Sequence, residues 1–281
     1  MSTLERYNNE ACLDLLVALL LMSVAKNLLY EGKAKIIYTT DEPEILLAHY
    51  KDDATAFNAQ KRGKIVGKGE INCKISQTLF QYLEARGIRT HFIDCPAPNQ
   101  MRVMRVKILP LEVVVRNIAA GSLCQQTGLP LGTVLKQPLV EFYYKNDQLG
   151  DPLLTRDRLL LMELATPDEL DQLQQQALQI NHYLSEFFQS CGITLVDFKL
   201  EFGLDAQGTI RLADEISPDT CRLWNSADTD PNTRVMDKDR FRRDLGNVEN
   251  AYQQVLERIQ LRGQESEDAL CADLRFRGQG N

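Results

Sequence analysis

The sequence predicts an α+β protein built from two lobes that pack against each other. In roughly the first 115 residues, short β-like runs surround one helical pattern. The rest of the chain carries a long helix with clear terminal signals, then two strands joined by a turn, then a closing helix. Strands and helices segregated in this way are typical of α+β folds. No internal repeat or low-complexity linker separates the halves, so we expect packed rather than tethered lobes.

The first lobe, residues 27–115, is predicted to be mostly antiparallel sheet. The run at 27–40 is rich in β-forming residues, turns at 40–43 and then resumes, which is typical of a hairpin. Residues 69–86 place apolar side chains at helical spacing, with Gly87 after the last turn, and therefore predict one packed helix. Three further β-like runs follow, at 90–95, 101–109 and 111–117.

The second lobe, residues 116–262, contains a strongly signalled helix at 166–192. Thr166 is a good N-cap and Pro167 suits the first helical position. Glu169 stands where the reciprocal partner of a capping box belongs. These signals fix the start of the helix, and a glycine at its far end fixes where it stops.

A strand pair and a final helix complete the second lobe. Residues 196–203 alternate apolar and charged side chains, 204–208 form a turn, and 209–214 return as a second strand. From about Asp239, apolar residues recur at intervals of three and four and predict a last helix: Leu245, Val248, Tyr252, Val255 and Ile259. The tail at 263–281 is polar, and we expect it to fray.

Composition and charge narrow the class of function. The 281-residue chain has a net charge of −7 and no long run of Lys or Arg, which argues against nucleic-acid binding. Binding of a small anionic metabolite in a locally positive pocket is compatible with this net charge. Seven cysteines without a C-x-x-C pair predict reduced thiols in the cytoplasm. The three histidines are far apart and lack the spacing of zinc ligands.

Residues 1–26 are predicted to be an extension that does not belong to either lobe. The apolar run at 11–25 is too short to span a bilayer comfortably and is interrupted by Asp14. It follows a net acidic stretch where a secretory signal needs positive charge, so we expect neither export nor a membrane anchor. We hypothesise that residues 1–21 are dispensable, because the chain from Met22 has the character of a protein start. Loss of activity in a chain that begins at Met22 would contradict this hypothesis.

Three charged residues share one face of the opening strand of the pair. Period-two alternation places Asp197, Lys199 and Glu201 on one side, opposite an apolar row. This face has two interpretations, the wet side of a half-buried strand or a reaction site. A loop at 205–208 would set Lys199 opposite Asp214, whereas a loop one residue longer or shorter would send Asp214 to the other face. Carboxylates gathered from paired strands suit Mg²⁺, whose remaining ligands are phosphate oxygens and water.

Positive groups that would meet phosphates occur near the start of the first lobe. Lys33 and Lys35 are two residues apart on a predicted strand face, just after Gly32, where a backbone can approach a ligand closely. Two lysines on a strand also fit a solvated sheet edge. The glycine-rich stretch at 63–69 lacks the spacing of a P-loop, so it does not supply the phosphate site.

Two arginines supply a second group of candidate anion ligands. Arg116 ends an apolar strand that runs into small residues and Ser122, and together these would cradle a phosphate or carboxylate. An exposed arginine at a strand end explains Arg116 equally well. Arg222 follows a Ser-Pro-Asp turn near Asp214, where it would neutralise an anionic substrate or else pair with Asp219 as a structural tie.

Six stretches together resemble the SAICAR synthetase family: YEGKAKIIY, DDATAFNAQKRG, PLEVVVRNIAAGS, VDFKLEFG, DEISPDTCRLW and MDKDRFRRDLG. They follow the family's order between about residues 28 and 259. The resemblance implies a smaller N-terminal antiparallel β lobe that binds nucleotide. It packs on a larger α/β ATP-binding lobe that holds the metal and substrate site, and the active site lies in the cleft between them.

The resemblance also implies an activity in de novo purine biosynthesis. The family is an ATP-dependent ligase that joins CAIR, a phosphoribosyl aminoimidazole carboxylate, to L-aspartate. The products are SAICAR, ADP and phosphate, formed through an acyl-phosphate intermediate. ATP as co-substrate, Mg²⁺, a cytoplasmic location and a homodimer are what the family leads us to expect.

Site residues carried over from the family fall into three groups. The ATP contacts implied are Gly32, Lys33, Lys35, Glu201 and Asp214, of which Glu201 and Asp214 are also the implied Mg²⁺ ligands. The residues implied at the reacting end of CAIR, and so catalytic, are Asp197 and Lys199. The remaining CAIR contacts implied are Arg116, Ser122 and Arg222 at the ribose phosphate and Asp219 beside the imidazole.

Two other functions stay open on the sequence alone. A small-molecule kinase would stop at phosphoryl transfer, and a regulatory protein would bind nucleotide in an idle site. Release of ADP that depends on aspartate indicates the ligase, release indifferent to aspartate indicates the kinase, and no release indicates the regulator.

Overall fold

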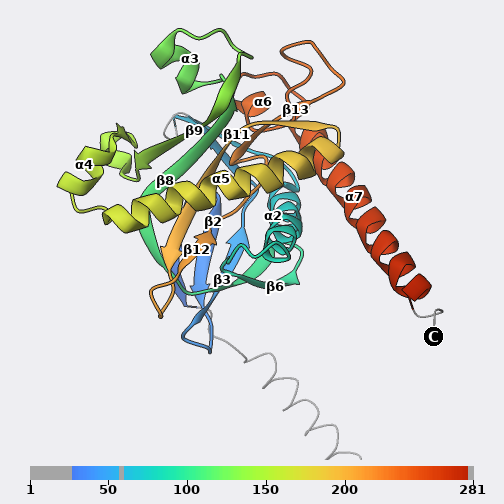
Figure 1. Cartoon of the computed structure of the whole chain (residues 1–281), viewed down its shortest axis with the longest axis horizontal. Helices are drawn as coiled ribbons and strands as arrows, with labels where there is room; N and C mark the ends of the chain where they lie inside the picture. The colour runs from blue at the N-terminus through green and yellow to red at the C-terminus, as the bar shows by residue number, and fades with distance from the viewer. Residues whose placement is uncertain (1–26, 57–59, 278–281) are drawn as a thin grey trace, which may run out of the picture.

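Two antiparallel sheets form the centre of the molecule (Figure 1). The computed structural model describes residues 27–56 and 60–277, with side chains described as far as residue 262. The first sheet has the strand order β1-β2-β3-β7-β6: β1 Leu28–Glu31, β2 Lys35–Thr39, β3 Ile45–Tyr50, β6 Phe92–Ala97 and β7 Gln100–Met104. A separate ribbon pairs β4 Asp53–Ala56 with β5 Lys61–Lys64.

The second sheet has the order β10-β9-β8-β11-β12, with β13 also paired to β11. Its strands are β8 Lys107–Ile118, β9 Val134–Tyr144, β10 Leu153–Leu154, β11 Ile193–Leu204, β12 Ile210–Ala213 and β13 Cys221–Asn225. The helical elements are α2 Lys68–Glu84, α3 Ser122–Thr127, the 3-10 turn Asp147–Leu149, α4 Arg156–Leu161, α5 Pro167–Ser190, α6 Asp239–Arg242 and α7 Val248–Arg277.

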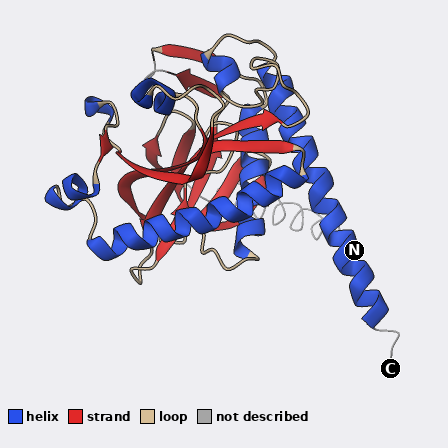
Figure 2. Ribbon diagram, turned by 45° about the horizontal axis from the view of Figure 1, so that its top comes forward, coloured by secondary structure: helices blue, strands red, loops and turns tan. Residues whose placement is uncertain are grey.

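The helices cover the sheets from outside and bury the apolar stripes that the sequence predicted. α5 lies across β8, β9 and β11, and α2 packs between the first sheet and α7 (Figures 1 and 2). In α2, Ile75, Leu79 and Leu83 are fully buried. The predicted capping box at the start of α5 is present, with the Thr166 and Glu169 side chains each accepting the other's backbone N–H.

One hydrophobic core extends through both lobes, as expected for lobes that are packed and not tethered. Phe80 of α2 and Met101 of the first sheet belong to the same buried cluster as Val113 and Phe198 of the second sheet. The change from one sheet to the other comes earlier than the predicted boundary between residues 115 and 116. All of β8 belongs to the second sheet, because its long apolar run pairs with β11 along its length.

The end of the chain differs from the prediction in two ways. The helix expected from Asp239 is two helices, because the backbone turns left-handed at Asp244, Gly246 and Asn247 between α6 and α7. α7 then continues to Arg277, through the tail that was expected to fray. The tail is polar but contains mainly residues of good helix propensity and no proline, so it can extend a helix that has already started.

The N-terminal segment, residues 1–26, lies outside the described residues, and so does the hypothesis that its first part is dispensable. Within the part of the chain that the structure describes, no helix is long and apolar enough to cross a membrane.

Candidate active site

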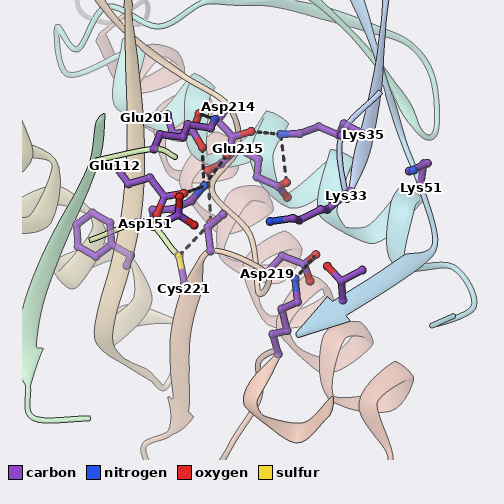
Figure 3. A pocket seen from close by; sticks show the side chains of 18 of the residues that line it. Lys33, Lys35, Lys51, Glu112, Asp151, Glu201, Asp214, Glu215, Asp219 and Cys221 are labelled. Carbon is purple, nitrogen blue, oxygen red and sulfur yellow. Dashed lines mark hydrogen bonds and ion pairs between the residues drawn. The ribbon is translucent and has the colours of Figure 1, made fainter. Parts of the chain in front are cut away.

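A cavity of about 1130 Å³ has walls from both sheets. Every residue that the sequence analysis selected for a role lines it: Gly32, Lys33, Lys35, Arg116, Ser122, Asp197, Lys199, Glu201, Asp214, Asp219 and Arg222. Figure 3 shows Lys35 of the first sheet and Lys33 of the turn before it on the side of the cavity that faces Asp214, Glu215 and Asp219. The structure therefore brings residues up to 190 positions apart in the chain into one cleft, the location that the sequence predicted.

The charged row of β11 is not the wet side of a strand. Asp197 and Glu201 are each only 4% exposed, although their side chains line the cavity. Lys199 between them is half-buried, with 25% of its side chain accessible. Buried charges are retained in proteins when they are paired or when a ligand needs them. Burial therefore contradicts the interpretation of this face as the wet side of a strand, and the reaction site stays a prediction.

The predicted register of the strand pair is wrong by one residue. The prediction set Leu204 opposite Thr209, whereas β11 and β12 pair Leu204 with Ile210. The Asp205 carboxylate accepts the backbone N–H groups of Gln207 and Thr209 and so holds a turn one residue longer than predicted. Aspartate often stabilises turns in this way, a contact that strand periodicity does not reveal.

Asp214 nevertheless reaches the predicted face, for a different reason. β12 ends at Ala213, and Asp214 adopts a left-handed backbone conformation with φ of 63°. The longer turn alone would have sent the Asp214 side chain to the opposite face of the sheet. The positive φ reverses the direction of the side chain and places its Oδ2 3.4 Å from Lys199 Nζ. Such a conformation is costly for a residue other than glycine and is often found at functional sites.

Lys199 holds a cluster of carboxylates together at one end of the cavity. Its Nζ lies 2.6 Å from Glu201 Oε1 and 3.2 Å from Glu112 Oε1, in addition to Asp214. Burial alone would lower the Lys199 pKa, but the three carboxylates outweigh it and raise that pKa well above its usual value. Lys145, which follows β9, forms an ion pair with the other oxygen of Glu201. Lys199 is therefore fully charged at neutral pH.

Lys35 is the second cation of this cluster and enters from the first sheet. It forms ion pairs with Asp214 and, at 3.1 Å, with Glu215 (Figure 3). It also lies over the ring of Tyr50. Burial would raise the Asp214 pKa, but Lys35 and Lys199 outweigh it and lower that pKa well below its usual value. Asp214 thus stays ionised throughout the physiological pH range.

Lys33 was predicted to share a strand face with Lys35, and this prediction is wrong. Lys33 lies in the turn between β1 and β2, because Gly32 donates its N–H to the Lys35 carbonyl and closes the turn there. Its side chain is 47% exposed and contacts Asp147 Oδ1 at 2.8 Å. Both lysines still line the cavity, one at its rim and one in its wall.

His91 is a buried group of the cavity wall that the sequence did not single out for a role. Among the described residues, its Nε2 is one of few buried polar side-chain atoms without a hydrogen-bond partner. Burial and the nearby charge of Lys35 lower the His91 pKa to about 3. The imidazole is therefore neutral at any pH at which the protein would work.

Two arginines converge on Asp197 at the other end of the cavity. Arg116 Nη1 and Arg222 Nη1 lie 3.0 Å and 2.7 Å from the same oxygen, Asp197 Oδ2. Arg116 also donates to Ser122 Oγ at 2.9 Å, so the two predicted cradle residues are neighbours, and to Glu141 Oε2 at 2.6 Å. These contacts exclude the interpretation of Arg116 as an exposed strand end, since it is only 3% exposed.

Arg222 does not pair with Asp219, the structural alternative that the sequence left open. Its Nε donates to Asp239 Oδ2 at 2.8 Å instead. The guanidinium packs so closely on Gly121 that a Cβ there would lie 2.4 Å from Nη2. Gly121 has φ of 53° and ψ of −130°, a combination that side-chain-bearing residues rarely adopt. The backbone conformation therefore favours glycine at this position, and a Cβ there would also force the end of the Arg222 side chain to shift.

Asp219 lies between the two ends and is held from the interior of the protein. Lys68 Nζ, at the start of α2, lies 2.8 Å from Oδ2, and Lys238 Nζ lies 3.5 Å from the same oxygen. Tyr252 of α7 donates to Oδ1 at 2.8 Å. The start of α2 does not form a phosphate site, because the Asp52 carboxylate accepts two of its free N–H groups.

Several residues of the site were missed by the sequence analysis: Lys68, Glu112, Glu141, Tyr143, Lys145 and Asp239. For some of them a signal existed. Glu112 is four residues before Arg116 on β8, and Glu141, Tyr143 and Lys145 are spaced by two along β9 and just beyond it. The same period-two rule that selected the row on β11 would have selected these faces. Lys68 had no such pattern, because its partner comes from a distant turn.

The fold and this cavity define an α+β enzyme with a highly charged cleft, in which lysines paired with carboxylates lie at one end and two arginines that share Asp197 lie at the other. Comparison with known proteins identifies the family. The model of the SAICAR synthetase family matches residues 28–259. The chain belongs to the SAICAR synthetase family.

Relatives cover nearly all of the matched region. Phosphoribosylaminoimidazole-succinocarboxamide synthases of Nostoc sp. and Trichormus variabilis are each 78% identical over 231 residues, which is 82% of this chain and 94% of theirs. The crystal structure of the Ehrlichia chaffeensis enzyme of that name is 44% identical with a TM-score of 0.80, covering 83% of this chain and 98% of that one. A SAICAR synthetase in complex with ADP is 45% identical with a TM-score of 0.78, covering 82% and 96%.

Proposed function

We propose that this chain is the ATP-dependent ligase of de novo purine biosynthesis that joins CAIR to L-aspartate and forms SAICAR, ADP and phosphate. Relatives at 78% identity carry the name of that synthase. The observation that carries the proposal is the layout of the cleft along β11. Asp197 meets the arginines, Glu201 meets the lysine and carboxylate cluster, and Lys199 lies between them on the same face.

The spacing along β11 suits two ligands bound end to end. Four residues of strand separate Asp197 from Glu201, which corresponds to roughly 13 Å. A phosphate anchored at Arg116 and Arg222 would therefore leave the other end of a nucleotide-sized substrate near Lys199. The phosphates of ATP, bound at the opposite end, would meet it there. Holding the two reacting groups at one point is how an active site lowers the entropic part of the barrier.

At the nucleotide end we assign Gly32, Lys33 and Lys35 of the first lobe to ATP. A relative of known structure was solved with ADP, which supports nucleotide use here. A fixed lysine is a suitable ligand for phosphate oxygens, and Lys35 is held in place by its ion pairs and by Tyr50.

We assign Glu201 and Asp214 to Mg²⁺. Among the described residues no group of three or more His, Cys, Asp or Glu side chains is arranged to hold a metal ion. Mg²⁺ at phosphate sites needs only one or two protein carboxylates, and these two already contact one shared cation, the Lys199 ammonium. When bound, the ion would neutralise charge on the transferring phosphoryl group.

At the substrate end we assign Arg116, Ser122 and Arg222 to the ribose phosphate and Asp219 to the imidazole. Asp197 keeps both guanidinium groups in place, and an anion bound there would share or replace the hydrogen bonds that they now make to Ser122, Tyr143 and Asp239. Arginine is well suited to this role, because its planar fork binds phosphate through two parallel hydrogen bonds.

The chemistry follows from the weakness of a carboxylate as an electrophile. Transfer of a phosphoryl group from ATP would convert the CAIR carboxylate into an acyl phosphate, so that the group to be expelled from the acyl carbon is phosphate instead of oxide. The amine of aspartate would then attack the acyl carbon, lose a proton and expel phosphate, which forms the amide. Lys199, at the middle of β11, would offset the negative charge that builds where the carboxylate and the phosphoryl group meet.

The decisive experiment measures ADP release by the purified protein with ATP, Mg²⁺ and CAIR, with and without aspartate. We expect release that depends on aspartate and equals SAICAR formed. Release indifferent to aspartate would indicate a kinase, and no release would indicate a nucleotide-binding regulator. The Glu201→Gln variant should abolish turnover, whereas Glu257→Gln, on the exposed side of α7, should not.

Assembly and location remain part of the proposal. We expect a homodimer in the cytoplasm, without nucleic-acid or membrane partners, as for a small-molecule enzyme of this family. Light scattering on a sizing column at micromolar concentration measures the mass of the assembly directly, and a monomer would contradict the first expectation.

A further inference from the structure

Asp219 is surrounded by donors that come from three separate elements. Lys68 approaches Oδ2 from α2, Tyr252 approaches Oδ1 from α7, and Lys238 approaches Oδ2 from the segment before α6. Its own N–H donates to Ser217 Oγ at 3.1 Å, which fixes the backbone of the turn. The side chain is only 2% exposed, yet the residue lines the cavity. Asp219 therefore presents a small, rigid acceptor surface to the cleft.

Lys68 and Tyr252, unlike Lys238, do not line the cavity. Lys68 is 1% exposed and Tyr252 is fully buried, so neither can touch a ligand in the cleft. A buried ion pair contributes little to stability compared with apolar residues of the same volume. Folding alone does not require an ammonium group under this turn, but a carboxylate that must stay ionised in a buried place does require one.

We infer that Lys68 and Tyr252 are positioning residues for the ligase reaction: they hold the Asp219 carboxylate ionised and in one orientation so that it accepts a hydrogen bond from the substrate. This inference rests on the proposed function, which sets the CAIR imidazole beside Asp219. A carboxylate accepts such a bond best without its proton. Oδ2 already accepts from Lys68 and Lys238, whereas Oδ1 accepts from Tyr252 alone and keeps acceptor capacity for a ligand. The ligand group recognised is an N–H donor, such as an amine on an aromatic ring.

The electrostatics agree with this geometry. Burial would raise the Asp219 pKa, but Lys238 and Lys68 outweigh it and lower that pKa well below its usual value. Other charged groups act on the neighbours of Asp219. Glu215 and Arg242 act on Lys238, and Asp237 acts on Tyr252. Without Lys68, burial would be opposed by Lys238 and Tyr252 alone, so the pKa would move upward toward the working range.

The test compares Lys68→Met with Lys74→Met, the same change at an exposed position of α2. We expect kcat/KM for CAIR in Lys68→Met to fall by up to about tenfold at pH 6 and to recover as the pH rises to 8.5, because a carboxyl group whose pKa lies about one unit above the pH is ionised in only about a tenth of the molecules. The KM for ATP should stay within about twofold, and Lys74→Met should match the parent protein. Thermal unfolding of each variant confirms the fold.

Tyr252→Phe is the second variant and keeps the test decisive if Lys68→Met does not fold. Loss of one hydrogen bond to a charged group should lower kcat/KM for CAIR about tenfold, again more at low pH than at high pH. Tyr183→Phe, on α5, is its control. A loss of activity that is uniform across pH, or that raises the ATP and CAIR KM values alike, would show a merely structural role and overturn the inference.

Failure of the inference and failure of the proposed function give different results. Parent protein without aspartate-dependent ADP release would contradict the proposed function. CAIR binding by calorimetry between pH 6 and 8.5 then still tests the positioning role. A pH dependence in Lys68→Met that the parent protein lacks supports the role, and equal profiles refute it.

Discussion

The contact between Gly121 and Arg222 is the most sensitive point of the substrate end. In Gly121→Ala the new Cβ would lie 2.4 Å from Arg222 Nη2 and 2.8 Å from Cζ. No contact this short survives, so the guanidinium must move away. Its hydrogen bonds to Asp197 and Asp239, at 2.7 Å and 2.8 Å, would then break. The change therefore displaces the proposed phosphate anchor without altering any charged residue.

Two terms set the expected loss of stability. The backbone of Gly121 has φ of 53° and ψ of −130°, and such strain costs a residue with a side chain about 1–3 kcal/mol. Each broken hydrogen bond to a charged group costs roughly 1.5–3 kcal/mol, part of which water restores. We expect a decrease of about 3–5 kcal/mol in the free energy of unfolding, or a Tm lower by about 10 °C for a chain of this size.

The assay separates displacement of the anchor from a general loss of fold. At a temperature where the variant is folded, kcat/KM for CAIR should fall roughly 30-fold or more, because a charge-assisted fork to phosphate is lost, while the KM for ATP changes little. Gly128→Ala, at the other end of α3, is the control: Gly128 also has positive φ, but nothing lies within 4 Å of its added Cβ. It should cost about 1 kcal/mol of stability and no activity. Equal CAIR kinetics in the two variants would refute the assignment of Arg222 to the substrate.

Four further changes test other parts of the site. Glu201→Gln should lower kcat at least 100-fold, because it weakens the metal site, and the variant should need a higher Mg²⁺ concentration for its half-maximal rate. A near-normal kcat would contradict the assignment of Glu201 to the metal. Arg222→Lys should raise the KM for CAIR about tenfold with a smaller effect on kcat, since a point charge cannot bridge Asp197 and Asp239, and unchanged KM would contradict this. In the folded protein His91 stays neutral down to about pH 3, whereas in the unfolded chain it is protonated below about pH 6.5, so it should destabilise the protein as the pH falls. In urea unfolding, His91→Gln should therefore reduce the difference in stability between pH 7.5 and pH 5.5 by about 1.4 kcal/mol. The same difference in the variant and the parent protein would exclude His91 as its origin. Removal of Mg²⁺ with EDTA should weaken ADP binding at least tenfold in calorimetry, and equal affinity would argue against a metal at Glu201 and Asp214.

Asp214 reached the predicted face through two features that strand periodicity does not contain. Hydrophobic periodicity placed each strand of the pair correctly, because alternation is a property of one segment and a buried face enforces it. The register depends instead on the turn, where the Asp205 carboxylate adds a residue. The predicted face was right only because the positive φ of Asp214 cancelled that error. Neither feature leaves a periodic pattern in the sequence.

Helix ends show the same division between local and long-range information. The start of α5 was predictable because Thr166 and Glu169 make their contacts within one turn of the chain. The break between α6 and α7 was not, because the side chain of Arg240 binds the carbonyl groups of Leu245 and Gly246 and stabilises a turn that interrupts an otherwise helical pattern. Lys68 is the extreme case: its partner, Asp219, is 151 residues away.

The charge balance of the nucleotide end explains why several lysines and carboxylates are found together there. Lys35, Lys145 and Lys199 face Glu112, Glu201, Asp214 and Glu215, so carboxylates outnumber lysines and each lysine is already paired. A nucleotide polyphosphate alone would bring further negative charge to a cluster with no surplus of positive charge. A divalent cation held by Glu201 and Asp214, as proposed above, would supply the missing positive charge when the nucleotide binds. The same cluster would then discriminate the metal-bound nucleotide from the free one, and the lysines, released from their carboxylates, would become available to the phosphates.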